Sequence, residues 1–218
     1  MKPIREILTT LVNHFPNGAF PGRKGEERPA AGSDPFQVLI STVLSQRTKD
    51  ENTYVASQRL FSKYKNPAEL AAAPLDDLME LIRPAGFPKA KSKAIKEIAR
   101  IIHQDYNDRV PNDMEKLLAL PLVGRKTANC VLVYGFGQDA IPVDVHVHRI
   151  SNRIGLVSTR TPGETEMELT RVVPRDLWKR INTVLIAFGK EICTPRNPNC
   201  SVCPINRYCD YFAEKRTR

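Results

Sequence analysis

The residues with the clearest chemical potential are four cysteines close to the C-terminal end of the chain. They follow the spacing Cys-x6-Cys-x2-Cys-x5-Cys, at Cys193, Cys200, Cys203 and Cys209. Cysteine thiolates bind zinc ions and iron–sulfur clusters, and this close spacing predicts one shared metal site. Zinc ribbons and fingers use two close pairs of ligands, whereas here only Cys200 and Cys203 form such a pair. The spacing therefore favours an iron–sulfur cluster, with a structural zinc site as the alternative.

A second candidate is a lysine that follows a turn between two expected helices. The segment LPLVGRKTAN, residues 120–129, indicates the end of one helix, a tight turn and the start of the next. Such a turn exposes backbone N–H groups that bind phosphate without reading base sequence. Lys126 falls in the first turn of the second helix, where the positive helix end favours a neutral, nucleophilic amine. A solvated lysine is the commoner case at a helix start, so this residue alone does not establish a reaction.

A third candidate is an aspartate in the segment IPVDVHVHR, residues 141–149. Asp144 stands between apolar residues at an expected helix start, where a lone aspartate is ordinarily an N-cap. His146 and His148 are two residues apart, so on a helix they point to different faces and do not form a metal-binding pair. We interpret them as hydrogen-bonding or DNA-facing groups.

Helices are the elements that must position these residues. Apolar residues recur at helical spacing from Ile4 to Val12, and the same pattern predicts helices over 36–44, 50–64, 67–73, 75–83, 89–104, 113–119, 125–134, 145–153, 164–173 and 176–189. Asp34 followed by Pro35 is typical of a helix start. Residues 16–34 are rich in Pro, Gly and charge, which predicts a long loop. We find no strand pattern of useful length, so the predicted fold class is all-α.

Two further features concern the cysteines. Cys130 lies within the apolar helix expected over 125–134, and we interpret it as a small buried hydrophobic residue. The last 26 residues, which contain the other four cysteines, have few periodic apolar positions. That segment therefore needs something other than a hydrophobic core in order to fold.

Composition and charge limit the class of protein. Of 218 residues, 41% are hydrophobic and 26% charged, which excludes a disordered chain. No apolar run approaches the roughly 20 residues of a membrane helix, and the N-terminus lacks a signal-peptide block. We therefore expect a soluble cytoplasmic protein, where disulfides are rare. The 33 Lys and Arg exceed the 24 Asp and Glu, and the net charge of +9 indicates a polyanionic partner.

Taken together, these motifs resemble the endonuclease III branch of the helix-hairpin-helix DNA glycosylases. The resemblance rests on the segment 120–129, on Val143-Asp144-x-His146 with Arg149, and on the four-cysteine ending. The segment Leu44–Asp50, and Gly86 with Lys91 and Ile95, fall where that family has related residues. The resemblance spans most of residues 35–212.

The resemblance implies two helical domains. A six-helix barrel with the helix-hairpin-helix motif would take residues 31–138. An iron–sulfur domain, built from both chain ends, would take residues 1–30 and 139–218 and carry a 4Fe-4S cluster. Double-stranded DNA would lie across the protein, with the damaged base flipped out of the duplex. The partner is thus expected to be duplex DNA with damaged bases or abasic sites, bound by a monomer without a membrane and, in a prokaryote, associated with the nucleoid.

The resemblance also implies roles for the two catalytic candidates. Lys126 corresponds to the family's catalytic lysine and Asp144 to its catalytic aspartate. Relatives that only remove bases tend to have Tyr or Ser at the position of Lys126. The expected activity is therefore bifunctional: removal of oxidised pyrimidines, then cleavage of the abasic strand by β-elimination through a lysine Schiff base. Asp144 would stabilise positive charge on the sugar or help to take the proton from Lys126.

The expected DNA contacts include two departures from the family pattern. The full set of candidates is Gln46, Arg47, Leu122, Gly124, Arg125, Thr127, His146 and Arg149. The family's hairpin usually has Gly where this chain has Leu122, which would be strained at a positive φ. The family's intercalating Gln aligns with Arg47, while Gln46 stands one place earlier, so either residue could fill the gap left by the flipped base.

Two alternatives to this function are a monofunctional mismatch or adenine glycosylase of the same superfamily and a non-catalytic DNA-binding module with a structural metal. Lys126 argues against the first alternative. The second gives no reason for Lys126 and Asp144 to occur together.

Overall fold

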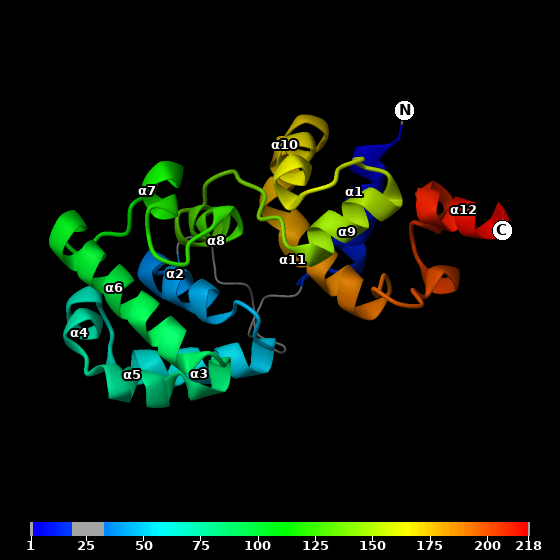
Figure 1. The fold of residues 1–218 in the computed structure, drawn as a ribbon. Coiled ribbons are helices and arrows are strands. Elements are labelled where there is room, and N and C mark those ends of the chain that lie inside the picture. The colour runs from blue at the N-terminus through cyan, green and yellow to red at the C-terminus, as the bar shows by residue number, and fades with distance from the viewer. Residues whose placement is uncertain (1, 19–32, 218) are drawn as a thin grey trace. The chain divides into compact units, whose positions relative to one another are not determined.

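The computed structural model describes residues 2–18 and 33–217, and it consists of helices and connecting loops (Figure 1). Within these residues there is no β-strand, so the predicted all-α fold is confirmed. The chain divides into two compact units. The terminal unit contains both chain ends, Met1–Phe20 and Asp139–Arg218, and the central unit contains Pro21–Gln138. The expected domain boundary at residues 30 and 31, and most of the expected loop over 16–34, lie outside the described residues.

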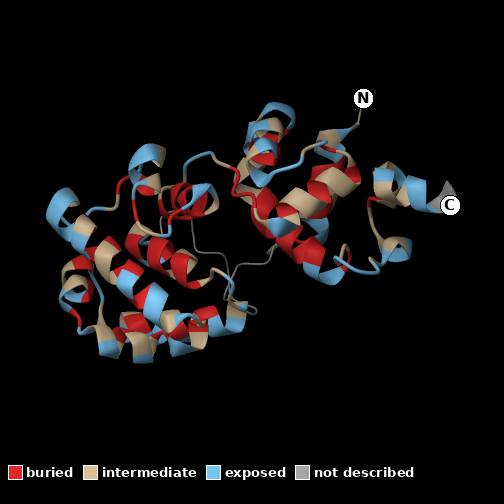
Figure 2. Ribbon diagram, viewed as in Figure 1, coloured by how far each residue is buried: buried red, intermediate tan, exposed pale blue. Residues whose placement is uncertain are grey.

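The central unit contains seven α-helices and two short helical turns among its described residues. These are α2 (Pro35–Leu44), α3 (Asp50–Lys63), α4 (Pro67–Ala72), α5 (Leu75–Leu81), η1 (Arg83–Ala85), α6 (Pro88–Tyr106), α7 (Met114–Leu118), α8 (Arg125–Cys130) and η2 (Val131–Gly135). Helix α6 packs against α4 and α5, and α2 packs against α3, α8 and η2. As its sequence predicts, α2 is buried almost all round, with Leu39, Ile40 and Leu44 inaccessible to solvent (Figure 2).

The terminal unit is built around one long buried helix. Its elements are α1 (Ile4–His14), α9 (Val145–Ile154), α10 (Pro162–Val172), η3 (Arg175–Leu177), α11 (Trp178–Glu191), η4 (Cys200–Val202), η5 (Asn206–Tyr208) and α12 (Asp210–Thr217). Helices α1 and α9 both pack against α11. The ring of Phe188 on α11 lies with its centroid 6.0 Å from that of Phe15, and both rings belong to the buried core of this unit.

Side-chain caps explain where several helices begin. Asp34 accepts a hydrogen bond from the N–H of Phe36 at 2.9 Å, and Pro35 occupies the first helical position, which confirms the predicted start of α2. Helix α10 begins at Pro162, two residues before the expected position, because Thr161 and Glu164 form a capping box.

The structure corrects the sequence analysis at two helices. The helix expected over 125–134 is α-helical only as far as Cys130 and then widens into the π-type turn η2. Helix α12 was not expected, because residues 210–217 have no apolar stripe that periodicity could reveal. Cys130 is 3% exposed, as predicted.

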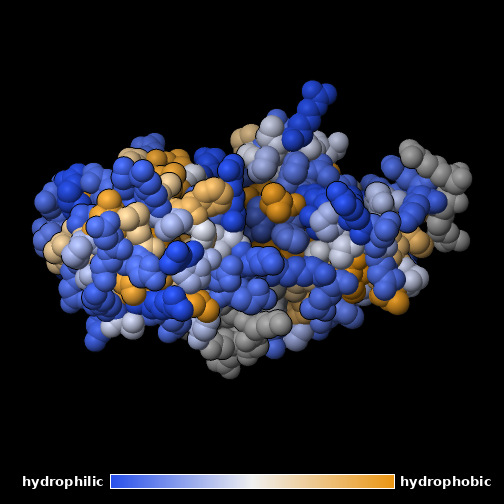
Figure 3. Space-filling model, turned by 60° about the horizontal axis from the view of Figure 1, so that its bottom comes forward, coloured by the Kyte–Doolittle hydropathy of each residue, from blue (hydrophilic) through white to orange (hydrophobic). Residues whose placement is uncertain are grey.

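The surface of the protein is mainly hydrophilic on the face that Figure 3 shows. In the described part of the chain, no helix combines the length and apolarity that crossing a bilayer requires.

Polar contacts tie the two chain ends together within the terminal unit. Lys2 Nζ donates to the carbonyl oxygens of Ile154 and Tyr208, at 2.7 and 2.6 Å, and to Asp210 Oδ1 at 2.6 Å. Gly155 ends α9 beside this contact with φ +79°, a conformation that favours glycine. A Cβ at Gly155 would lie 1.8 Å from Asp210 Oδ2, so both the backbone and the packing require glycine here.

We therefore predict that Gly155→Ala lowers the free energy of unfolding by about 1–3 kcal/mol, from left-handed strain and displacement of Asp210. Gly163→Ala is the matched control, because nothing lies within 4 Å of its Cβ position and its φ is not positive. Thermal denaturation should show a lower midpoint for Gly155→Ala than for Gly163→Ala. Equal midpoints would contradict the requirement for glycine at residue 155.

Candidate functional site

The predicted helix-hairpin-helix is present as α7, a tight turn and α8. The turn is closed by the N–H of Val123, which donates to the carbonyl of Leu120 at 3.2 Å. Leu122 adopts φ +57°, the positive value that sequence analysis associated with strain, and its side chain is 48% exposed. Gly124 is the N-cap residue of α8, so that helix begins without a side-chain cap.

Lys126 lies in the first turn of α8, as expected. Its side chain is half-buried, between the exposed Arg125 and the buried Thr127. The backbone of this turn is fixed by the hydrogen bond from Ala128 N–H to the Gly124 carbonyl, at 2.9 Å. The amine therefore projects from a short rigid helix rather than from a loop.

Gln46 joins the loop after α2 to the hairpin. Its Nε2 donates to the Leu122 carbonyl at 2.8 Å and to Thr127 Oγ1 at 3.4 Å. Arg47, the next residue, has φ +52° and is exposed. The two candidates for the intercalating residue thus have different environments, since Gln46 is bonded to the hairpin and Arg47 points to solvent.

Asp144 is the N-cap residue of α9 in the terminal unit, as predicted. Its Oδ1 accepts hydrogen bonds from the N–H groups of His146 at 2.9 Å and Val147 at 2.8 Å. These two bonds fix the plane of a half-buried carboxylate, and Oδ2 takes part in neither. A carboxylate held in this way has a defined direction in which it can stabilise positive charge.

The other candidates on α9 form contacts inside the terminal unit. Arg149 Nη2 donates to the carbonyl of Cys193 at 2.9 Å and to His146 Nδ1 at 3.3 Å, and burial lowers the pKa of the Arg149 guanidinium. His148 Nδ1 instead lies 2.6 Å from Thr165 Oγ1. Arg149 thus links α9, the helix that Asp144 caps, to the cysteine segment.

Arg153 is a residue that sequence analysis missed. Its Nη1 donates to the Thr194 carbonyl at 2.7 Å and lies 3.6 Å from Cys193 Sγ, and its Nη2 donates to the Pro195 carbonyl at 2.7 Å. The sequence could have identified Arg153 by its position four residues after Arg149, because this spacing places both arginines on the same face of a helix.

The four cysteines line one small apolar hollow in the terminal unit. Its other walls include Ile154, Phe188, Ile192 and Ile205. Burial raises the pKa of Cys203 to about 11 and also raises that of Cys209. Without a metal these thiols therefore keep their protons. A bound metal cation displaces the proton and becomes the positive partner of the sulfur.

A set of four thiols around one apolar hollow is a donor set that fits an iron–sulfur cluster. A single zinc ion would draw its sulfur ligands within 2.3 Å of one point, whereas a four-iron cluster holds four cysteines around a larger body. The hollow between Cys193, Cys200, Cys203 and Cys209 therefore fits a 4Fe-4S cluster, which would supply Fe–S bonds that hold this core-poor segment folded.

We predict that Cys203→Ser loses most of its iron and unfolds at a lower temperature, because the segment depends on metal–ligand energy. Cys130→Ser is the control, since this cysteine lies in the central unit, outside the set. Iron content and the visible absorption of the purified proteins test the expectation. Full iron content in Cys203→Ser would contradict the ligand set.

Acidification of the unmodified protein should also release iron, because protons compete for thiols whose pKa is raised.

Comparison with protein families gives two matches. Residues 40–175 match the family described as the HhH-GPD superfamily of base excision DNA repair proteins. Residues 193–209, which span the four cysteines, match the iron–sulfur binding domain of endonuclease III.

Individual proteins are similar over nearly the whole chain. Endonuclease III of Thermotoga maritima is 49% identical over 212 residues, which cover 97% of this chain and 94% of the relative. A solved non-covalent endonuclease III–DNA complex is 32% identical, with a TM-score of 0.87 over 99% of this chain and 97% of that chain. A trapped covalent endonuclease III–DNA intermediate is 34% identical, with a TM-score of 0.86 over the same shares.

Proposed function

Because the chain belongs to the endonuclease III family of helix-hairpin-helix base-excision repair proteins, we propose that Lys126 and Asp144 carry out its chemistry on DNA. The protein is a bifunctional DNA glycosylase and abasic-site lyase with a 4Fe-4S cluster. The observation that supports the assignment of Lys126 is its place in the first turn of α8, directly after the hairpin. Oxidised pyrimidines in duplex DNA are the substrate class, and the cytoplasm is the compartment.

Lys126 acts as the nucleophile in this proposal. The lone pair of its neutral Nζ forms a bond to C1′ of the damaged nucleotide, and the glycosidic bond breaks with its electron pair leaving on the base. The amine then loses a proton, and the sugar ring opens to give a Schiff base between Nζ and C1′. Removal of a proton from C2′ expels the 3′-phosphate, so that the strand is nicked by β-elimination. Hydrolysis of the Schiff base returns the free amine.

Asp144 stabilises the positive charge that develops on the sugar as the base departs. Its Oδ1 is occupied by the two backbone N–H groups at the start of α9, which orient the carboxylate before substrate arrives. Preorganised charge of this kind costs no rearrangement at the moment of reaction. Asparagine retains the cap acceptor and removes only the charge, so the two roles of Asp144 can be separated.

We predict that Lys126→Gln abolishes borohydride trapping on DNA with an abasic site, because no Schiff base can form. Asp144→Asn should lower base release by about 10²–10³-fold while α9 remains capped. Lys93→Gln, at an exposed position on α6, is the matched control for charge loss and should trap normally. Normal trapping by Lys126→Gln would show that another amine is the nucleophile.

Arg47 fills the gap that the flipped base leaves in the duplex. It is exposed at a left-handed position, whereas the amide of Gln46 is already engaged by the Leu122 carbonyl. The extended guanidinium can stack in the space of a missing base and contact phosphate. Gln46 instead holds the hairpin in register with this loop.

We predict that Arg47→Ala weakens binding to duplexes with a lesion by about 5–30-fold, equivalent to 1–2 kcal/mol, with a much smaller effect on undamaged duplex. Lys49→Ala removes the same charge from a nearby exposed position and is the control for a general loss of phosphate attraction. Titration at fixed salt measures both. An equal loss for damaged and undamaged duplex would assign Arg47 to phosphate binding alone.

A further inference from the structure

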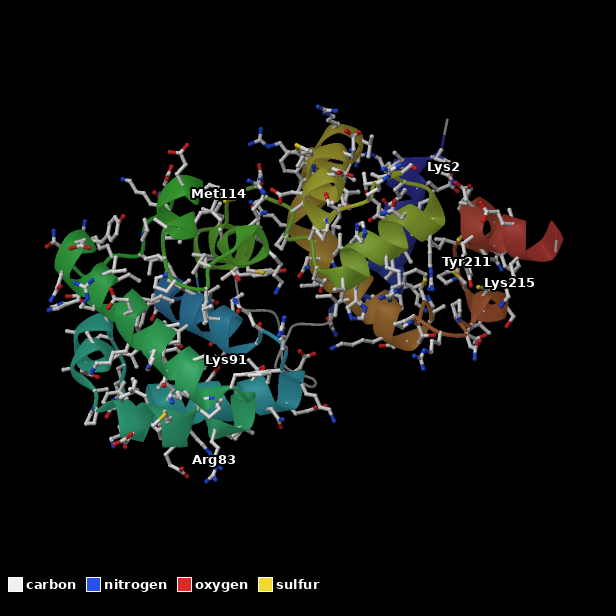
Figure 4. All side chains as sticks on the ribbon, in the orientation of Figure 1. Lys2, Arg83, Lys91, Met114, Tyr211 and Lys215 are labelled. Carbon is white, nitrogen blue, oxygen red and sulfur yellow. The ribbon has the colours of Figure 1, made fainter. Side chains whose placement is uncertain are left out.

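Lys91 is a buried lysine that the reaction above does not use. It lies on α6, is labelled in Figure 4, and is 3% exposed. Its Nζ lies 2.7–2.8 Å from the Leu44, Gln46 and Ala85 carbonyl oxygens and from Thr48 Oγ1, so its three N–H donors are shared among four acceptors. All four acceptors are neutral oxygens, so the ammonium group sits in a cage rather than in an ion pair.

The position of this cage explains why a charge is tolerated there. Leu44 is the last residue of α2, and its carbonyl lies at the negative end of the helix dipole without a helical donor. The ammonium group supplies donors to this helix end and, through Ala85, to η1. Burial lowers the pKa of Lys91 to about 8, while the four oxygens favour the charged form.

Two of the four oxygens around Lys91 come from the loop that holds Arg47. The carbonyl of Gln46 and the hydroxyl of Thr48 both bond to Lys91, so contacts flank the left-handed Arg47 on each side. The Thr48 hydroxyl is also bonded to the Ala85 carbonyl. A non-glycine residue remains in such a conformation only when its surroundings fix it.

We infer that Lys91 is a positioning residue whose ammonium group serves as an internal cation, fixing residues 45–48 so that Arg47 projects toward DNA. The inference rests on the proposed role of Arg47 in duplex DNA. Lys91 itself touches neither the substrate nor the reacting atoms.

This role predicts a difference between two substrates. A duplex with a flipped nucleotide has a gap to be filled, whereas an abasic single strand has none. Loss of the cation should therefore impair reaction on the lesion duplex more than Schiff-base formation on the abasic single strand. A general loss of folding would lower both activities by the same factor.

Lys91→Met tests the inference, because methionine retains the length of the chain and removes the charge and the donors. We expect kcat/KM on a lesion duplex to fall by about 10²-fold, as a misplacement near 1 Å can cause. Trapping on the abasic single strand should fall by less than about threefold. Lys93→Met, an exposed lysine on the same helix, should change neither activity.

A spectroscopic measurement tests the loop directly. A 2-aminopurine opposite the lesion should show a smaller fluorescence rise on binding Lys91→Met than on binding the unmodified protein, because less of the gap is filled. Thr48→Val is the second variant, for use if Lys91→Met does not fold. It removes one partner of the ammonium group and leaves the charge, so it should give the same pattern more weakly.

Equal losses on both substrates for Lys91→Met and Thr48→Val, with unchanged 2-aminopurine signals, would overturn the inference. Failure of the proposed catalytic function has a different signature, namely retention of trapping by Lys126→Gln.

Discussion

The hydrogen bond from the Gln46 amide to the Leu122 carbonyl joins the two segments of the central unit on which the proposed chemistry depends. The left-handed conformation of Leu122 turns the chain into α8, and α8 presents Lys126. The donor of this bond, Gln46, belongs to the loop that also carries Arg47, and the Lys91 ammonium group bonds to the Gln46 carbonyl. In the proposed mechanism, lesion recognition by Arg47 and nucleophilic attack by Lys126 therefore depend on two segments that this hydrogen bond joins.

In the terminal unit, the last segment of the chain has little apolar surface of its own and needs another source of stability. The hollow lined by Cys193, Cys200, Cys203 and Cys209 replaces a hydrophobic core with metal–ligand bonds. Arg149 and Arg153 connect that segment to α9, whose first turn is capped by Asp144. The cluster thus supports the helix that orients the proposed catalytic carboxylate, and it need not change redox state to do so.

Residue types and spacing predicted much of this structure. The helices appeared because their apolar faces and caps are local signals, as at Asp34 with Pro35, and the cysteine set was visible as a motif. Other features depend on contacts between distant segments. The sequence around Lys91 does not indicate that four oxygens from α2, the loop after it and η1 surround its ammonium group. Likewise, only the folded chain shows that the Gln46 side chain bonds to the hairpin and that of Arg47 does not. Helix α12 lacks an apolar stripe, so periodicity could not reveal it.

The identity of the nucleophile is the central claim, and the most direct measurement is the location of the covalent adduct. The unmodified protein would be mixed with DNA that contains an abasic site, reduced with borohydride and digested, and the peptide bearing the sugar remnant would be sequenced by mass spectrometry. We expect the remnant on Lys126, in the peptide of the hairpin and α8. An adduct on the amino group of Met1 or on another lysine would contradict the account.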